Sequence, residues 1–168
     1  GAQRIVGVEL EDNPDFIAAV SNATAPAILL APGPAAIDLR EAPPSGPVTL
    51  VVVDGTWPQA RKLLRVNPSL QRIPHYAFEP ATASNYRIRR EPAAHCVSTI
   101  EATVAALSLL EAQRGADAKE VEKVLAVFDA MVDHQLRIAR ERAESRHLHA
   151  AIARSARQGA VTGLDGLE

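Results

Sequence analysis

Residues Val48-Thr-Leu-Val-Val-Val53, followed at once by Asp54-Gly-Thr-Trp57, give the clearest indication of the protein's architecture. A short run of uncharged, mostly β-branched residues is typical of a strand that is buried on both faces. The Asp-Gly step after it is a turn signal. Pro58 then suits the first turn of a helix, and Thr56 offers a hydroxyl to cap it. The stretch therefore predicts a strand, a tight turn and a helix that ends near Val66.

Asp54 is the first candidate functional residue, because it follows the predicted strand directly. In open α/β sheets, ligands bind beyond the carboxyl ends of the parallel strands. This position makes Asp54 a candidate catalytic carboxylate. The structural alternative is that Asp54 only turns or caps the chain.

The rest of the chain alternates between patterns for strands and for helices. Strands are predicted at residues 3–10, 27–30 and 75–78, and loops at 31–35 and 41–47. A helical or irregular stretch is expected at 14–20, and helices at 98–112 and from 117 to about 140. This order predicts an α/β sheet with covered faces, in one domain over residues 1–158 with a loose tail over 159–168.

Composition indicates an ordinary globular protein. The chain has 168 residues, of which 47% are hydrophobic and 23% charged. No stretch approaches the ~18 apolar residues of a membrane span, and no secretory signal pattern opens the chain. Cys96 is the only cysteine, which excludes an internal disulfide and a multi-cysteine zinc site. We therefore expect a cytoplasmic protein, without a metal site in this chain and monomeric.

The net charge of −2 does not by itself indicate a nucleic-acid partner. RNA affinity depends on local clusters of cations, however, so a near-neutral total is compatible with RNA binding. Cations gather at Arg61, Lys62 and Arg65, at Arg87, Arg89 and Arg90, and at Arg137, Arg140, Arg142, Arg146, Arg154 and Arg157. The structural alternative for the last group is a solvated helix face.

A second block, Tyr86-Arg87-Ile88-Arg89-Arg90, is followed by Ser98-Thr99-Ile100-Glu101-Ala102. Together with Asp54-Gly-Thr-Trp57 and Gln59-Ala-Arg-Lys62, in this order, these motifs resemble the DTW-domain family. Members of that family are similar to tRNA-uridine aminocarboxypropyltransferases and to the SPOUT-like RNA-modifying enzymes. The resemblance runs from about residue 4 to about residue 136 and is densest between 48 and 110.

The resemblance implies a SPOUT-like sheet flanked by helices, with a C-terminal trefoil knot that binds S-adenosylmethionine. It implies transfer of the donor's 3-amino-3-carboxypropyl group to N3 of a tRNA uridine, with release of methylthioadenosine. Because the sulfonium activates three carbons, the protein selects the product mainly by positioning. Two alternatives stay open: a SPOUT-type RNA methyltransferase with the same donor, and an RNA-binding module without activity. Many bacterial relatives carry a cysteine-rich segment ahead of this core, and the single cysteine here departs from that pattern.

For this reaction, Asp54 and Trp57 are the candidate catalytic residues. Asp54 would act as general base toward the uridine N3 proton, or would hold the donor's ammonium group. Trp57 would stack on the adenine or the uridine, or lie near the sulfonium as a cation–π partner. The alternative for Trp57 is an anchor between helix and sheet. The expected donor-binding residues are Asp54, Gly55, Thr56, Trp57, Ser98 and Thr99.

Ser98 and Glu101 also fit a capping box at the start of a helix, which explains both without a ligand. Because a helix N-terminus offers free N–H groups to an anion, Ser98 and Thr99 are expected both to cap the helix and to border the donor pocket. Glu101 is expected to cap the helix.

Substrate RNA is expected at the arginine-rich segment, where arginines would bind phosphate or the donor's carboxylate and a tyrosine would stack on a base. If the segment is extended, alternate residues face opposite ways. The structural alternative is a surface strand with salt bridges to Glu79 or Glu91. The expected RNA-binding residues are Arg61, Tyr86, Arg87, Arg89 and Arg90.

Overall fold

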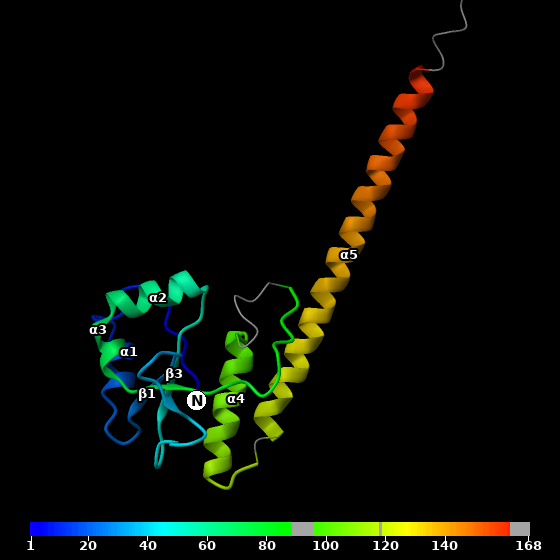
Figure 1. Cartoon of the computed structure of the whole chain (residues 1–168). Helices are drawn as coiled ribbons and strands as arrows, with labels where there is room; N and C mark the ends of the chain where they lie inside the picture. Colours follow the sequence, from blue (N-terminus) through cyan, green and yellow to red (C-terminus); the bar gives the residue numbers. More distant parts are fainter. Residues whose placement is uncertain (89–95, 118, 162–168) are drawn as a thin grey trace, which may run out of the picture.

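The protein is an α/β fold built on a parallel four-stranded sheet (Figure 1). The structure, a computed structural model, describes residues 1–88, 96–117 and 119–161, with side chains in the last range described up to residue 146. The sheet has the order β2-β4-β1-β3. Its strands are β1 (Ala27–Leu30), β2 (Ile37–Asp38), β3 (Thr49–Val52) and β4 (His75–Ala77). This confirms the predicted α/β class, while the SPOUT class and the trefoil knot stay predictions.

Parallel pairing brings the carboxyl ends of three strands to one edge of the sheet. Leu30 of β1 lies opposite Val52 of β3 on one side and opposite Tyr76 of β4 on the other. The segments that leave these strands are therefore neighbours, although they are far apart in the sequence. Asp54 leaves β3 at this edge, as the sequence predicted.

Helices cover both faces of the sheet. On one face lie α1 (Pro14–Val20), α2 (Trp57–Val66) and α3 (Pro68–Arg72), and on the other α4 (Thr99–Gln113) (Figure 1). Successive residues of β1 point to opposite faces. Leu29 accordingly packs in a core cluster with Phe16 and Leu70, and Ile28 packs in a second cluster with Ala106. The predicted alternation of strands and helices therefore builds one covered sheet with a core on each face.

Two elements were not predicted from the sequence. β2 has only two residues, which is too short to show a periodic pattern. α3 begins at Pro68, directly after Asn67, which is both the C-cap of α2 and the N-cap of α3. Proline fits the first position of a helix, because its missing N–H would have no partner there. The Asn67-Pro68 pair therefore ends one helix and starts another.

The predicted strand at residues 3–10 is wrong. Asn67, which is fully buried, binds this segment with its side chain. Its Oδ1 accepts the N–H of Leu10 at 2.7 Å, and its Nδ2 donates to the carbonyls of Val8 and Leu63, each at 2.7 Å. The segment thus finds hydrogen-bond partners in one amide side chain instead of a neighbouring strand, and Val6 stays exposed.

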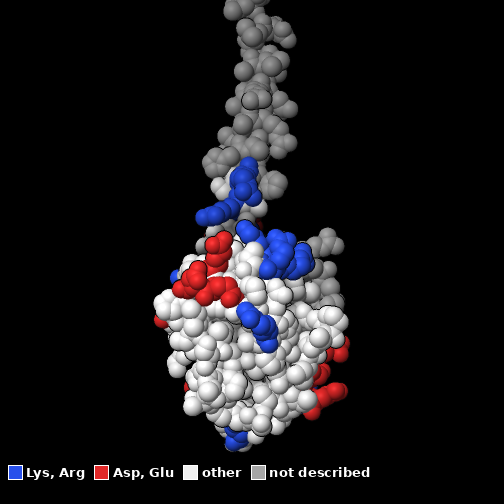
Figure 2. Space-filling model, turned by 90° about the vertical axis from the view of Figure 1, so that its left-hand side faces the viewer, with Lys and Arg blue, Asp and Glu red and all other residues white. Residues whose placement is uncertain are grey.

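The last helix, α5, runs from Lys119 to Val161, so the helix expected to about residue 140 and the stretch after it, which has helical propensity, form one continuous helix. Its first part packs against α4, where Phe128 and Val132 are buried. Its later part projects from the body of the protein, and lysine and arginine side chains lie near its base (Figure 2). Of the helices in the described ranges, none combines the length and the apolar character that crossing a membrane requires.

Candidate active site at the carboxyl edge of the sheet

A cavity of about 1210 Å³ opens at the edge where β1, β3 and β4 end. Its wall combines Pro32 after β1, Asp54 after β3 and Phe78 after β4 with Ser98 before α4 and Phe128 of α5. Small-molecule pockets usually measure ~300–1,000 Å³. The cavity is therefore large enough for a nucleoside-sized donor together with part of a second substrate.

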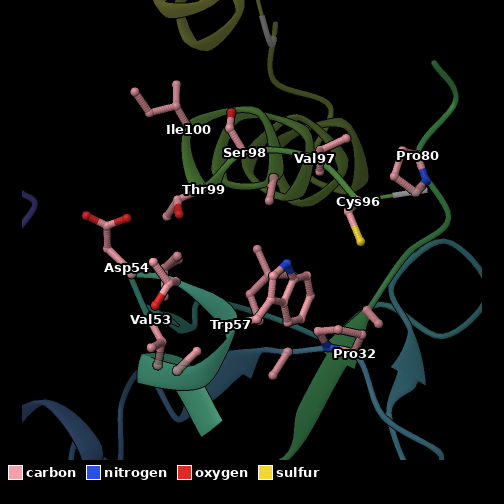
Figure 3. A pocket seen from close by; sticks show the side chains of 18 of the residues that line it. Pro32, Val53, Asp54, Trp57, Pro80, Cys96, Val97, Ser98, Thr99 and Ile100 are labelled. Atoms are coloured by element: carbon pink, nitrogen blue, oxygen red, sulfur yellow. The ribbon is translucent and has the colours of Figure 1, made fainter. Parts of the chain in front are cut away.

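Asp54 lies at one end of this cavity, with its carboxylate turned away from the strands (Figure 3). Its side chain is exposed and has no hydrogen bond or ion pair with any residue that the structure describes. The capping role considered for Asp54 belongs instead to Thr56, which is the N-cap of α2. A carboxylate that is exposed to a cavity and has no protein partner is available to bind or deprotonate a ligand.

The turn that carries Asp54 is held by Gln59. Oε1 of Gln59 accepts the backbone N–H of Thr56 at 2.7 Å and the Thr56 hydroxyl at 2.8 Å. Gly55 has a φ of +150°, which favours glycine, and a Cβ there would lie 3.2 Å from Oε1 of Gln59. Glycine is therefore required at position 55 by the geometry of the turn, while the neighbouring Asp54 lines the cavity.

Trp57 is the first residue of α2, and its indole lies inside the cavity (Figure 3). The side chain is 39% exposed and belongs to neither core cluster. This exposure argues against the interpretation of Trp57 as an anchor between helix and sheet. It leaves an aromatic face accessible to a ligand.

The opposite wall is the start of α4, where the predicted capping box is confirmed. The N–H of Ser98 donates to Oε2 of Glu101 at 2.8 Å, and the N–H of Glu101 donates to Oγ of Ser98 at 3.3 Å. Thr99 also lines the cavity. The residues proposed to border a donor therefore sit on a helix start whose geometry is fixed by hydrogen bonds.

Glu101 does more than cap the helix. Its carboxylate also accepts the hydroxyl of Ser84 and the N–H of Asn85, both at 2.7 Å. Burial raises the pKa of Glu101, but the hydrogen bonds from Ser98, Ser84 and Asn85 outweigh it and hold the pKa below its ordinary value. The charged form of Glu101 thus joins α4 to the segment that leads into Tyr86.

Residues 84–87 dock on α5 through three contacts. The ring of Tyr86 packs against Phe128 with centroids 5.7 Å apart, and Asn85 donates to Asp129 at 2.7 Å. Arg87 forms an ion pair with Asp133. The structural alternative of a surface strand does not hold for this part of the segment, because Arg87 and Ile88 form a turn. The salt bridge foreseen by the structural alternative does form at Arg87, but its partner is Asp133 of α5 and not Glu79.

The structure brings most of the predicted site residues together. Arg87 is not among the residues that line the cavity, and Arg89, Arg90 and Glu91 lie outside the described residues. The side chains of Arg154 and Arg157 also lie outside the described set. The predicted residues that line the cavity are Asp54, Gly55, Thr56, Trp57, Arg61, Tyr86, Ser98 and Thr99.

Sequence reasoning missed the apolar part of the wall, which includes Pro32, Phe78, Cys96, Phe128 and Met131. Apolar residues carry no chemical signature, so only the helical pattern around Phe128 was a usable signal. Among the residues that the structure describes, no three His, Cys, Asp or Glu side chains gather to hold a metal ion.

Comparison with known proteins places these residues in a family. A tRNA-uridine aminocarboxypropyltransferase 2 from Drosophila melanogaster is 38% identical over 87 residues, which cover 51% of this chain and 35% of the relative. The protein of the same name from Mus musculus is 32% identical over 120 residues, covering 68% of this chain and 40% of the relative. That from Macaca fascicularis is 29% identical over 119 residues, again 68% and 40%.

The chain therefore spans less than half the length of these relatives. No solved structure matches it. The family model described as "DTW domain" matches residues 2–136, which include β1 to β4, the Asp54 turn and the start of α4. The chain belongs to the DTW domain family.

Proposed function

We propose that this chain transfers the 3-amino-3-carboxypropyl group of S-adenosylmethionine to N3 of a uridine in tRNA. The names of the curated relatives support both the reaction and the class of substrate. The proposal includes tRNA as the macromolecular partner and a monomer in the cytoplasm as the working form. The observation that carries it is the exposed carboxylate of Asp54, which has no partner among the described residues and shares one large cavity with the accessible indole of Trp57.

The proposed step needs a nucleophile, a leaving group and a proton acceptor. N3 of uridine loses its proton to the carboxylate of Asp54 and attacks the methylene carbon that joins the aminocarboxypropyl chain to sulfur. A carbon–nitrogen bond forms as the carbon–sulfur bond breaks, and its electron pair stays on sulfur. The products are the modified uridine and neutral methylthioadenosine, and the proton leaves Asp54 to solvent. A positioned base of this kind contributes ~10²–10⁴-fold to a rate.

The other cavity residues have the chemistry to hold the donor. Trp57 offers a ring face to the sulfonium, an interaction worth roughly 0.5–2 kcal/mol. Thr99 offers its hydroxyl, and Ser98 and Thr99 together place the start of α4 toward the donor's polar end (Figure 3). The walls around Phe78 and Phe128 offer apolar surface against which the donor would pack. Together these groups select among the three activated carbons by orientation.

The experiment is a product analysis with the 168-residue chain, total tRNA and S-adenosylmethionine. We expect methylthioadenosine in amounts equal to the uridines that gain the aminocarboxypropyl mass after nuclease digestion. S-adenosylhomocysteine with methylated RNA would overturn the proposal in favour of a methyltransferase. Donor and tRNA binding without either product would overturn it in favour of an RNA-binding module.

A further inference from the structure

Several basic residues of the described surface lie where α5 leaves the body and on the part of the body beside it. Figure 2 shows lysine and arginine at both places, with acidic residues to one side. The cations of α2 are Arg61, Lys62 and Arg65, and those of the described outer part of α5 are Arg137, Arg140, Arg142 and Arg146. Both helices contribute to the cavity wall, α2 through Trp57 and Arg61 and α5 through Phe128 and Met131.

Two of the α5 arginines lie on the side of the helix that faces the cavity. An α-helix turns by about 100° per residue, so Arg142 lies about 20° from Met131 around the helix axis and Arg146 at about the angle of Phe128. Both arginines are exposed, and within the described residues neither forms an ion pair. Their charges are therefore available to a ligand that reaches the cavity along α5.

The other two arginines lie on the far side of the same helix. By the same rotation, Arg140 is about 180° from Met131 and Arg137 is about 180° from Phe128. Arg137 also has partners: its guanidinium contacts Nδ1 of His134 at 2.8 Å and Oε1 of Glu141 at 3.9 Å. The outer part of α5 thus has a free basic side toward the cavity and a partly neutralised side away from it.

The spacing of these cations excludes a small anion as their common ligand. With a rise of about 1.5 Å per residue, Arg142 lies about 16 Å beyond Met131 along the helix, and Arg146 about 27 Å beyond Phe128. Arg61 lines the cavity on the other helix. Only an extended polyanion can contact Arg61 and the α5 arginines at once, and the phosphate backbone of RNA is such a polyanion.

We propose that Arg142 and Arg146 of α5, together with Arg61 of α2, bind the phosphate backbone of the tRNA while its target uridine occupies the cavity. This inference rests on the proposed function for the identity of the RNA. Phosphate contacts position an RNA without reading its sequence. The α5 arginines therefore set where the RNA lies relative to Asp54, and they contribute affinity that depends strongly on salt.

The test compares two matched double variants, Arg142→Ala/Arg146→Ala and Arg137→Ala/Arg140→Ala. Each removes two positive charges from the exposed outer part of α5 and introduces the best helix former. Binding of total tRNA is measured at several salt concentrations, with circular dichroism to check the helix. The first variant is expected to bind at least about tenfold more weakly at low salt, with a log–log salt slope smaller by about 1.5 because each lost phosphate contact removes ~0.7–0.9. The second is expected to change both values much less.

Equal losses from the two variants, or no loss from either, would overturn the proposed surface. Binding requires no turnover, so this result is independent of the product analysis. A wild-type chain that binds tRNA through Arg142 and Arg146 but forms no methylthioadenosine would retain the surface and refute the transfer reaction. If the wild-type chain forms methylthioadenosine and the two variants bind tRNA equally well, the transfer reaction is supported and the proposed surface is refuted.

Discussion

Ser84 and Glu101 are 17 positions apart in the sequence, yet the hydroxyl of Ser84 donates a 2.7 Å hydrogen bond to Oε2 of Glu101. The same hydroxyl accepts the N–H of Tyr86 at 3.0 Å. One carboxylate thus connects the start of α4 with the residue whose ring packs on Phe128 of α5. Two walls of the cavity are therefore held together by a short chain of hydrogen bonds.

Asp54→Asn is expected to lower the rate of methylthioadenosine formation by about 10²–10⁴-fold, because an amide cannot accept the uridine proton. Stability should change by no more than about 0.5 kcal/mol, since the side chain is exposed and has no described partner. Single-turnover kinetics and urea unfolding measure the two effects. Asp12→Asn, another exposed carboxylate outside the cavity wall, is the control. A large loss of stability with Asp54→Asn would assign Asp54 to the turn instead.

Trp57→Ala is expected to weaken S-adenosylmethionine binding by about 2- to 30-fold, which corresponds to roughly 0.5–2 kcal/mol for a cation–π contact. Methylthioadenosine has no positive charge on sulfur, so its binding should weaken less. Calorimetric titration of both ligands separates the two roles considered for the indole. Equal losses for the two ligands would show that Trp57 stacks on adenine and does not contact the sulfonium.

Gly55→Ala is expected to destabilise the protein by about 1–3 kcal/mol, because an L-residue at φ +150° is strained and its Cβ would lie 3.2 Å from Oε1 of Gln59. Activity should fall with it, since the turn positions Asp54. Gly33→Ala is the matched control for stability: a Cβ there meets nothing within 4 Å. Urea unfolding compares the two, and equal midpoints would show that the turn tolerates a side chain.

Acidification is expected to weaken the link made by Glu101. Burial raises the pKa of Glu101, but the hydrogen bonds from Ser98, Ser84 and Asn85 lower it by more than burial raises it. The pKa of Glu101 therefore lies below its ordinary value. A carboxylate with a lowered folded-state pKa contributes its full stability above its unfolded-state pKa of ~4.3 and loses it as pH falls through the folded-state pKa. Urea midpoints measured from about pH 6 down to pH 3 should therefore decrease below about pH 4.3, in part because of Glu101.

The control for this pH dependence is Glu101→Gln, which should flatten part of the decrease. Glu11 adds a second contribution of the same sign, because hydrogen bonds from the hydroxyl and N–H of Ser69 lower its pKa. Glu11→Gln therefore separates the two carboxylates. A Glu101→Gln profile that parallels the wild type would exclude Glu101 from the acid transition.

The sequence predicted the central part of the fold because its signals there are local and strong. Three stretches carry such signals. The run from Val48 to Val53 is apolar and mostly β-branched, Asp54 begins a turn signal, and Ser98 begins a capping box. Asp54, Gly55, Thr56 and Trp57 line the cavity because they follow β3, whose carboxyl end lies at the same edge of the sheet as those of β1 and β4.

The failures have physical causes that a single sequence does not display. Residues 3–10 alternate like a strand, but the buried side chain of Asn67 takes their hydrogen bonds over a separation of 57 to 59 positions. The structural alternative for the arginine-rich segment named Glu79 or Glu91 as ion-pair partners, whereas Arg87 pairs with Asp133, 46 positions away on α5. Both errors concern polar contacts between distant segments, for which a local pattern holds no information.

Phe128 and Met131 complete the cavity from a helix that carries none of the recognisable polar motifs. A related chain truncated before residue 119 would keep every such motif and still lack one side of its pocket. Genome searches that rely on the motifs alone would count such shortened paralogues as competent enzymes. Requiring a downstream apolar helix as well gives a structural criterion for telling them apart.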